Sequence, residues 1–367
     1  MKIALLGPAS SIHLQRWAAA LVGKGHAVHV ISQHYDEPVA TMEGLASATW
    51  LPHRGTAGYL LNARALGQVI AKLLPDVLNT HYASGYGLTA STIWSVPTLL
   101  SVWGSDVYDF PYESWLKGRL IRWNLRRATR VASTSRIMAC QVAKLVPELE
   151  PAFVTPFGVD CKRFGPAAQR DARYLSIGTV KTMAAKYGID LLLRAFASLL
   201  DDPAIQTADV GGRLRLMLVG GGVERDALES LAKRLGIHDR VEFIGQVGHD
   251  EVASWLNRFD IYVAASRLDS ESFGVAAIEA SACGVPVVVS DAGGLPEVVK
   301  DGVTGIVVPR ENVPALAAAL KRLVLDETLR RAMGEAGRRW VLDHYEWNSC
   351  VDVMLACYEQ VIASRRV

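Results

Sequence analysis

The stretch of sequence that decides the fold runs from Ile261 to Pro309 and reads IYVAASRLDSESFGVAAIEASACGVPVVVSDAGGLPEVVKDGVTGIVVP. Its opening, Ile261 to Ala265, is an apolar run that predicts a buried strand. After a polar turn, the segment GVAAIEASACG places small apolar residues at helical spacing. Gly284 and Pro286 end this helix, and Val287 to Val289 predict a second strand. A buried strand, a helix and another buried strand indicate a parallel sheet in an α/β fold.

One carboxylate interrupts this otherwise apolar helix. Glu279 has no polar helix face to occupy, and a buried carboxylate is costly unless a partner binds it. Glu271 precedes the helix, and Gly274 leaves the backbone bare at the helix start, where N–H groups and the dipole favour an anion. Two carboxylates with an anion site between them suit a ligand with hydroxyls at both ends and phosphate in the middle. The pattern therefore predicts a nucleotide sugar as ligand.

The same residues carry a resemblance to a known family. The spacing of Glu271 and Glu279, with Phe273 and Gly274 between them and GGLPE at 293–297 after them, resembles the retaining glycosyltransferases of family 4. The resemblance extends from about Ala172 to the C-terminus and is weaker before it. It implies the GT-B fold, an α/β architecture of two Rossmann-like domains that face each other across a cleft. It also implies a final helix that crosses back to the first domain.

The chain of 367 residues is long enough for two domains of ordinary size. Residues 1–168 are predicted to form an acceptor-binding domain and residues 169–345 a domain that binds the nucleotide sugar. The segment FVTPFGVDCKRFG at 153–165 resembles the linker of the family. Residues 346–367 are predicted to be the helix that packs back on the first domain.

Composition limits the class of protein. The five cysteines are scattered without a CxxC pair, which favours reduced thiols over a zinc site or a disulfide framework. The start MKIALLGP does not resemble a signal peptide, and no apolar run is long enough to span a membrane. We therefore expect a cytoplasmic protein, peripheral on the inner face of the membrane. Residues 1–165 carry a net charge of +6 and residues 166–367 one of −4, so the first half invites an anionic partner.

The resemblance assigns the parts of the donor. Glu279 is expected to bind the ribose diol. Glu271 is expected to be catalytic and to bind the hydroxyls of the transferred sugar, with the N–H groups of Phe273, Gly274 and Val275 beside it. Lys186 matches the lysine that binds the diphosphate. Thr179 stands where the family carries an arginine, and Lys181 is the nearest replacement. The glycines 220–222 resemble a phosphate loop, but a tight strand-to-helix turn explains them better.

The first domain offers candidates at the ends of its strands. The loop that begins at Gly7 is expected near the donor phosphate, and His13 and Arg16 near the acceptor. His81 and Asp106 follow two further predicted strands, at the ends where ligands bind in open α/β sheets, and are predicted to be catalytic. Trp103 stands where many members of the family carry histidine. Packing for His13 and turn capping for Asp106 remain open as alternatives.

The segment from Trp115 to Lys144 is basic and contains no acidic residue after Ser114. Its arginines and lysines alternate with Trp and Leu, a pattern that suits a helix lying on an anionic membrane surface. The alternative is a solvated basic face. Nucleic acid is a poor candidate, because no recognition module is present.

The resemblance therefore implies a retaining hexosyltransferase, which we expect to need neither a metal nor a cofactor. It would move a sugar from a nucleoside diphosphate to a hydroxyl of a glycan or lipid-linked acceptor in polysaccharide biosynthesis. A nucleotide-sugar epimerase of the same fold and a catalytically silent scaffold subunit remain as alternatives. The donor base, the sugar and the acceptor are not encoded in any pattern that we recognise.

Overall fold

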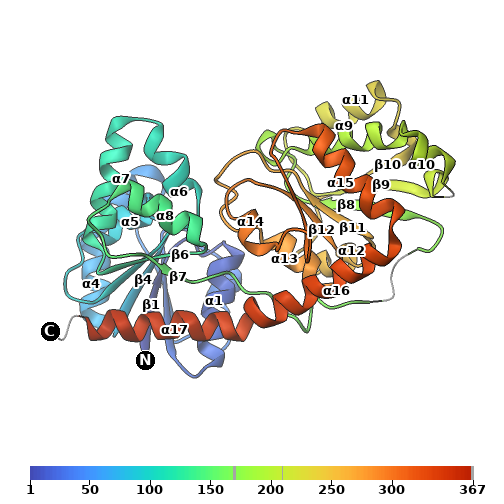
Figure 1. Ribbon diagram of the computed structural model, residues 1–367. Coiled ribbons are helices and arrows are strands. Elements are labelled where there is room, and N and C mark those ends of the chain that lie inside the picture. Colours follow the sequence, from blue (N-terminus) through green and yellow to red (C-terminus); the bar gives the residue numbers. More distant parts are fainter. Residues whose placement is uncertain (168–170, 209, 365–367) are drawn as a thin grey trace. The chain divides into compact units, whose positions relative to one another are not determined.

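The structure is a computed structural model that describes residues 1–167, 171–208 and 210–364. The chain forms two compact units, shown in Figure 1. Unit 1 contains Met1–Pro156 and Asn348–Val367, and unit 2 contains Phe157–Trp347. Each unit is an α/β domain with one parallel sheet, as predicted.

Unit 1 has a seven-stranded sheet in the order β3-β2-β1-β4-β5-β6-β7. Its strands are β1 (Lys2–Leu6), β2 (Ala27–Ser32), β3 (Ser47–Trp50), β4 (Val77–His81), β5 (Thr98–Ser101), β6 (Arg130–Ser133) and β7 (Phe153–Val154). Its helices are α1 (Ile12–Gly23), α2 (Glu37–Ala40), α3 (Gly55–Leu61), α4 (Ala63–Leu73), α5 (Gly85–Ala90), α6 (Ser105–Tyr108), η1 (Phe110–Tyr112), α7 (Trp115–Arg127), α8 (Arg136–Leu145) and α17 (Trp347–Ala363).

Unit 2 has a six-stranded sheet in the order β10-β9-β8-β11-β12-β13. Its strands are β8 (Leu175–Val180), β9 (Leu214–Val219), β10 (Val241–Gly245), β11 (Ile261–Ala264), β12 (Val287–Ser290) and β13 (Gly305–Val308). Its helices are η2 (Ala185–Tyr187), α9 (Ile189–Leu200), α10 (Pro203–Thr207), η3 (Gly211–Arg213), α11 (Arg225–Arg234), η4 (His238–Arg240), α12 (Val252–Leu256), α13 (Val275–Ala282), α14 (Leu295–Val298), α15 (Val313–Leu325) and α16 (Glu327–His344).

The strand order reverses once in each sheet, between β1 and β4 in unit 1 and between β8 and β11 in unit 2. At such a reversal the loops at the carboxyl ends of the strands diverge to opposite faces, and ligands bind between them. The apolar side chains of β8 and β9 meet those of α9, α11 and α15 on one face of the sheet in unit 2. This core holds the loops after β8 and β11 on a rigid base.

The final helix belongs to unit 1, which confirms the predicted return of the chain. The buried Tyr358 hydroxyl of α17 donates to Asn79 Oδ1 on β4 at 2.8 Å. Lys24 Nζ, just after α1, lies 2.6 Å from Asp352 Oδ1. In Figure 1 the helix runs along the lower edge of unit 1.

The linker segment packs on unit 2 rather than ending unit 1. The Phe157 ring lies edge-on to Phe273, 6.1 Å away, and Asn257 Nδ2 donates to the carbonyl of Gly165 at 3.0 Å. Unit 2 therefore begins at Phe157, ahead of the boundary expected after residue 168, which itself lies outside the described residues.

The basic segment is not one helix, contrary to the prediction. It contains α7, β6 and α8 in succession, with β6 paired to β5 inside the sheet. Its sequence has no acid, but acids just outside it neutralise three of its cations: Glu113 pairs with Lys117, Glu148 with Arg126 and Glu150 with Arg130. Helix α7 carries the exposed Trp115, Leu116 and Trp123, and it is therefore the candidate surface helix considered below.

Candidate functional site

The loops after β8 and β11, at the reversal in unit 2, bring a lysine and a glutamate into contact. Lys181 Nζ lies 2.7 Å from Glu271 Oε2, and the two side chains are 13% and 10% exposed. Ser266 Oγ donates to the same carboxylate oxygen at 3.1 Å. Burial by itself would lower the pKa of Lys181, but the adjacent Glu271 carboxylate outweighs it and raises that pKa. The pair is therefore a nearly desolvated ion pair.

The second predicted phosphate ligand, Lys186, lies close by. Lys181 Nζ is 4.8 Å and Lys186 Nζ 5.0 Å from the centre of the Tyr187 ring, so both ammonium groups approach one aromatic side chain. Lys186 forms no ion pair within the part of the chain that the structure describes. This loop thus offers one cation that is already paired and one available for an anionic ligand.

Helix α13 starts beside this pair. Gly274 has φ +90°, a conformation that favours glycine, and a Cβ there would come within 2.7 Å of Leu295 Cδ2. The first N–H groups of a helix have no carbonyl of an earlier turn to bind. The Phe273 side chain is buried against Phe157 and Tyr345. Phe273 can therefore contact the nucleotide sugar through its backbone N–H, as predicted, but not through its ring.

Glu279 lies about one turn into α13 and is 4% exposed. The charge of Glu279 and the charges of the ion pair all act on the phenol of Tyr262, which is fully buried on β11. Burial raises the pKa of Tyr262; Lys181 opposes that shift, and the charges of Glu271 and Glu279 add to it. Lys181, Glu271 and Glu279 are therefore near enough to this phenol for their charges to act on it, although Lys181 and Glu271 are 90 residues apart in sequence.

The GGLPE motif positions the Glu271 loop. Gly293 has φ +50°, and a Cβ there would lie 2.2 Å from the carbonyl oxygen of Glu271. Gly294 N donates to that same carbonyl at 2.9 Å, and Gly293 N to Asp269 Oδ1 at 3.2 Å. The two glycines thus allow one loop to lie directly against the other. The GGLPE motif carries part of the resemblance, and the structure adds its role as a support for Glu271.

The turn before α13 carries two carboxylates, Asp269 and Glu271, and these two pair with different cations. Asp269 Oδ1 lies 2.8 Å from Arg310 Nη1, whereas Glu271 pairs with Lys181. Each carboxylate therefore has its own cation, which leaves little free charge for a shared metal ion.

The glycines 220–222 support the Lys181 loop. A Cβ on Gly220 would lie 2.0 Å from the carbonyl oxygen of Lys181, and Met183 N donates to the carbonyl of Gly221 at 2.8 Å. Close backbone packing therefore accounts for the triple glycine, as the turn interpretation expected.

In unit 1 the reversal point is aromatic rather than charged. His81 ends β4, and a Cβ on Gly7 would lie 3.1 Å from His81 Cβ. The Trp103 ring is edge-on to His81 at 5.5 Å and to His13 at 5.8 Å. His81 is 1% exposed; its burial, and secondarily His13, lowers its pKa to about 3. His13 lies at the start of α1, and Arg16 lies about one turn further along the same helix.

Two predicted residues of unit 1 are engaged by the backbone. The Gly7 N–H donates to the carbonyl of Ile31, so this amide already has an acceptor. Asp106 has no exposed surface and accepts from the N–H groups of Ala83, Trp103 and Gly104 at 2.7, 3.0 and 2.8 Å. Direct substrate contact, as predicted for a catalytic Asp106, would require breaking those bonds; the geometry instead makes it a residue that holds the Trp103 loop.

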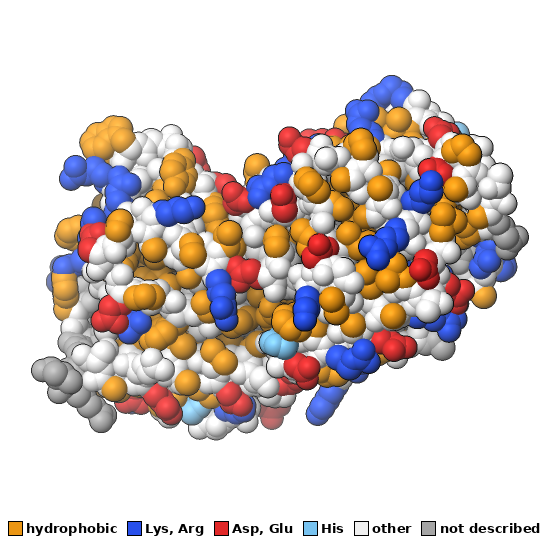
Figure 2. Space-filling view, in the orientation of Figure 1, with side chains coloured by type: hydrophobic (Ala, Val, Ile, Leu, Met, Phe, Trp, Pro, Cys, Tyr) orange, Lys and Arg blue, Asp and Glu red, His pale blue; other side chains and the backbone are white. Residues whose placement is uncertain are grey.

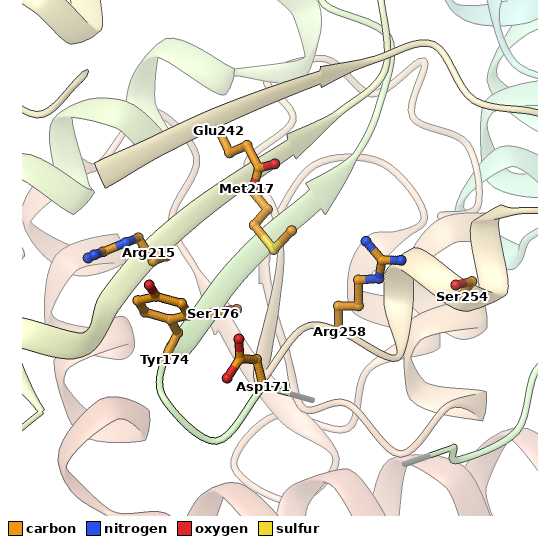
Figure 3. Close-up of a pocket in the computed structure, with 8 residues that line it drawn as sticks. All are labelled: Asp171, Tyr174, Ser176, Arg215, Met217, Glu242, Ser254 and Arg258. Atoms are coloured by element: carbon orange, nitrogen blue, oxygen red, sulfur yellow. The ribbon is translucent and has the colours of Figure 1, made fainter. Parts of the chain in front are cut away.

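A cavity of about 640 Å³ in unit 2 lies away from all of these residues. It is lined by Ser176 and Glu242 near the amino-terminal ends of β8 and β10 and by Met217 of β9, and Arg258 reaches into it from beyond the end of α12 (Figure 3). Lys181 and Glu271 follow the opposite ends of their strands. The cavity is therefore not part of the site at the reversal.

Helix α7 presents apolar and basic side chains together. Trp115, Leu116 and Trp123 are more than half exposed. Figure 2 shows basic and hydrophobic side chains intermixed on the surface of this part of unit 1. Arg119 and Arg122 line a groove of about 650 Å³ with Leu116 and Trp123, and neither arginine has an ion-pair partner among residues 1–167, 171–208 and 210–364. Across those same ranges no helix combines the length and apolarity that crossing a bilayer demands.

Two family models match the chain. The model for glycosyl transferases group 1 matches residues 166–340, and a glycosyl transferase 4-like model matches residues 2–135. The solved structures of similar fold include sucrose-phosphate synthase from Thermosynechococcus elongatus, with a TM-score of 0.83, 23% identity and 99% of both chains covered. HepE of Anabaena in complex with UDP also has a TM-score of 0.83, with 18% identity over 98% of this chain and 100% of that one.

Curated relatives share more sequence. A D-inositol 3-phosphate glycosyltransferase of Geodermatophilus obscurus is 35% identical over 79% of this chain and 69% of its own length. A GDP-mannose-dependent phosphatidylinositol monomannoside mannosyltransferase of Mycolicibacterium smegmatis is 34% identical over 53% of this chain, and the match spans only about half of that relative, 52%. With these matches over both units, the chain belongs to the group 1, GT4-like glycosyltransferases, and its two parallel-sheet domains are those of the GT-B fold.

Proposed function

We propose that the protein transfers a sugar from a nucleoside diphosphate to a hydroxyl of a glycan or lipid-linked acceptor, with retention at the anomeric carbon. The observation that carries the proposal is the ion pair of Lys181 and Glu271 at the reversal point of unit 2, with Lys186 beside it. A diphosphate needs cations and a sugar needs hydrogen-bond acceptors, and these loops supply both side by side.

Each part of the donor then has a partner. Lys186 and Lys181 neutralise the diphosphate, with the N–H groups at the start of α13. Glu271 accepts hydrogen bonds from the donor sugar, held in place by Ser266 and by the glycines of the GGLPE loop. Glu279 takes the ribose hydroxyls, which would give this buried carboxylate charge-assisted bonds.

The chemistry proposed for the protein is positioning and charge stabilisation. The leaving phosphate takes the proton of the acceptor hydroxyl on the same face, and the lysines stabilise the negative charge that develops on it. Asp269 and Glu271 are each held by a separate cation, which supports a mechanism without a metal.

For the acceptor, inositol phosphates are the first candidates, because the relatives named above act on inositol-containing compounds. For the location, α7 is proposed to rest on an anionic membrane surface, with Trp115, Leu116 and Trp123 inserted at the interface and Arg119 and Arg122 over the headgroups. A lipid-linked acceptor would then be reached from the membrane plane.

The direct test supplies GDP-mannose and UDP-glucose with D-inositol 3-phosphate or water as acceptor. A transferase releases nucleoside diphosphate and yields a glycoside of retained configuration, detected by NMR. Return of an isomeric nucleotide sugar would identify an epimerase. Tight nucleotide binding without turnover of any donor would favour the silent scaffold, and inversion of configuration would overturn the retaining mechanism.

A further inference from the structure

Lys186 lies in a short, partly exposed turn that is held by an arginine from another loop. The turn, η2, is a single turn of 3-10 helix, whose hydrogen-bond geometry is poorer than that of an α-helix. Arg267 lies in the loop after β11, which also carries Glu271. Arg267 N donates to the carbonyl of Lys186 at 2.8 Å, and Arg267 Nη1 donates to that of Ala185 at 2.6 Å. These two carbonyls flank the Cα of Lys186, so Arg267 fixes the backbone from which the lysine extends.

The same guanidinium holds the other end of the segment. Asp190 lies in the first turn of α9, and its Oδ1 and Oδ2 accept from Arg267 Nη1 and Nη2, each at 2.8 Å. A bidentate pair of this kind fixes orientation as well as distance. Burial by itself would raise the pKa of Asp190, but the hydrogen bonds and charge of Arg267 outweigh it and lower that pKa. Between the two ends, Gly188 has φ +62°, and a Cβ there would lie 2.0 Å from the carbonyl oxygen of Ala265. The segment 185–190 is therefore packed directly onto the loop after β11.

The hydrogen-bond donors of Arg267 are mostly engaged within the protein. A guanidinium has five N–H groups. Nη1 donates to two acceptors and Nη2 to one, and Nε lies 3.3 Å from Glu311 Oε1. The Glu311 side chain is 64% exposed, so this last contact contributes little. These contacts leave Arg267 little capacity to bind a phosphate directly.

We propose that Arg267 is a positioning residue for the donor diphosphate, because it holds Lys186 in place beside Lys181 and Glu271. This rests on the proposed assignment of Lys186 to the diphosphate. Arg267 thereby links the loop that binds the phosphates to the loop that binds the transferred sugar. Its effect on the ligand passes through Lys186, and it is separate from the ion pair that Lys181 forms with Glu271.

Hydrogen exchange measured by mass spectrometry tests whether Arg267 holds the segment. Arg267→Lys keeps the positive charge but loses the bidentate geometry. The backbone amides of residues 184–192 should then exchange roughly 2- to 10-fold faster, as for the loss of about one net hydrogen bond, without a change in β12. Glu311→Gln removes only the exposed partner and should leave exchange in 184–192 unchanged. Equal exchange in Arg267→Lys and wild type would overturn the positioning role, whatever the protein binds.

Calorimetry with UDP and GDP, each compared with its nucleoside, tests the consequence for phosphate. Arg267→Lys should weaken diphosphate binding by roughly 5- to 30-fold and leave nucleoside binding unchanged. In a Lys186→Ala background the same substitution should change the affinity by less than about 2-fold, because the lysine through which it acts is gone. Equal losses in both backgrounds, or unaltered affinity in Arg267→Lys alone, would overturn the inference.

Asp190→Asn separates geometry from charge. It removes a negative charge from the phosphate side of unit 2, which by itself would strengthen diphosphate binding, but it also breaks the bidentate pair. Positioning by Arg267 requires weaker binding, by roughly 3- to 10-fold, and stronger binding would show that the pair acts only through its charge. If the wild type binds neither UDP nor GDP, the proposed function fails instead, and hydrogen exchange still decides whether Arg267 holds the segment.

Discussion

The two sheets reverse their strand order in the same way, yet their reversal points differ in chemistry. In unit 2 the loops carry charges that are paired within the protein, Lys181 with Glu271 and Arg310 with Asp269. In unit 1 the corresponding loops carry rings, with Trp103 edge-on to both His81 and His13, and the buried Asp106 is bound to backbone amides. The topology thus fixes where a ligand can bind, and the loop residues decide which ligand.

The largest effect is expected at the charged reversal point. Glu271→Gln keeps the shape of the side chain but removes the charge that Lys181 and the donor sugar share, so kcat should fall by about 100-fold or more, as for other groups that act in the transition state. Glu311→Gln, on an exposed partner of Arg267, is the matched control and should retain turnover. Steady-state kinetics with calorimetric nucleotide binding separate the two steps; near-normal kcat in Glu271→Gln would remove the assigned role.

Lys186, which forms no ion pair within the described residues, and Lys181, which pairs with Glu271, are tested separately for their contribution to diphosphate binding. A hydrogen bond to a charged group contributes about 1.5–3 kcal/mol, so Lys186→Ala should weaken nucleoside diphosphate binding by roughly 10- to 150-fold and leave nucleoside binding unchanged. Lys181→Ala should weaken it as much if Lys181 replaces the arginine missing at Thr179. Isothermal titration of both variants measures this; unaltered affinity in Lys181→Ala would confine that lysine to holding Glu271.

The glycine support of the Glu271 loop should be sensitive to one methyl group. Gly293→Ala places a Cβ 2.2 Å from the Glu271 carbonyl oxygen at φ +50°, so the free energy of unfolding should fall by about 1–3 kcal/mol. Activity should fall further than the loss of folded protein explains, because the loop must move. Gly212→Ala, where a Cβ meets nothing within 4 Å, is the control. Thermal melts and kcat, measured on the same samples of Gly293→Ala and Gly212→Ala, test both expectations.

At the aromatic reversal point the expected effect is a loss of stability of the folded protein at acidic pH. The pKa of His81 is about 3 in the folded protein and about 6.5 in the unfolded chain, so below pH 6.5 the unfolded state binds a proton that the folded state does not. Stability contributed by the neutral imidazole is therefore lost as pH falls from about 6.5 towards 3. The Tm of His81→Phe should exceed that of wild type by a margin that grows between pH 7 and pH 4.5, and a constant margin would contradict the buried neutral state.

The smallest effect concerns the surface of unit 1. Replacing Arg119 and Arg122 with Gln should reduce sedimentation with vesicles that contain anionic lipid by a few-fold, at about 1 kcal/mol per cation, and high salt should do the same to wild type. Lys117 and Arg126 already pair with Glu113 and Glu148, so their replacement should matter less. Equal binding to neutral vesicles would show that charge does not direct the contact.

The sequence predicted most of unit 2 because its strands are continuous apolar runs and its helices end at Gly or Pro. It failed at β6, a short strand next to the edge strand β7, because Arg130 begins this strand within a basic segment and hides its apolar character. The identity of Lys181, Lys186 and Glu271 as neighbours came from the resemblance. The ion pair between Lys181 and Glu271 could not be predicted, because it depends on loop geometry that is set by glycine contacts between distant segments. The same limit applies to Asp106, whose position at the end of a strand is equally compatible with a ligand or a backbone amide.

The return of α17 to unit 1 has a consequence for how such chains can be recombined. Unit 2 is one continuous segment, Phe157–Trp347, inserted into a unit 1 whose own sequence is split between the two ends of the chain. The donor-binding half is therefore a cassette with two junctions. An exchange of cassettes between related enzymes that preserves the Tyr358–Asn79 hydrogen bond leaves unit 1 whole, whereas an exchange at a single junction replaces part of its framework. Chimeras designed with two crossover points should consequently express and fold where single-crossover chimeras do not.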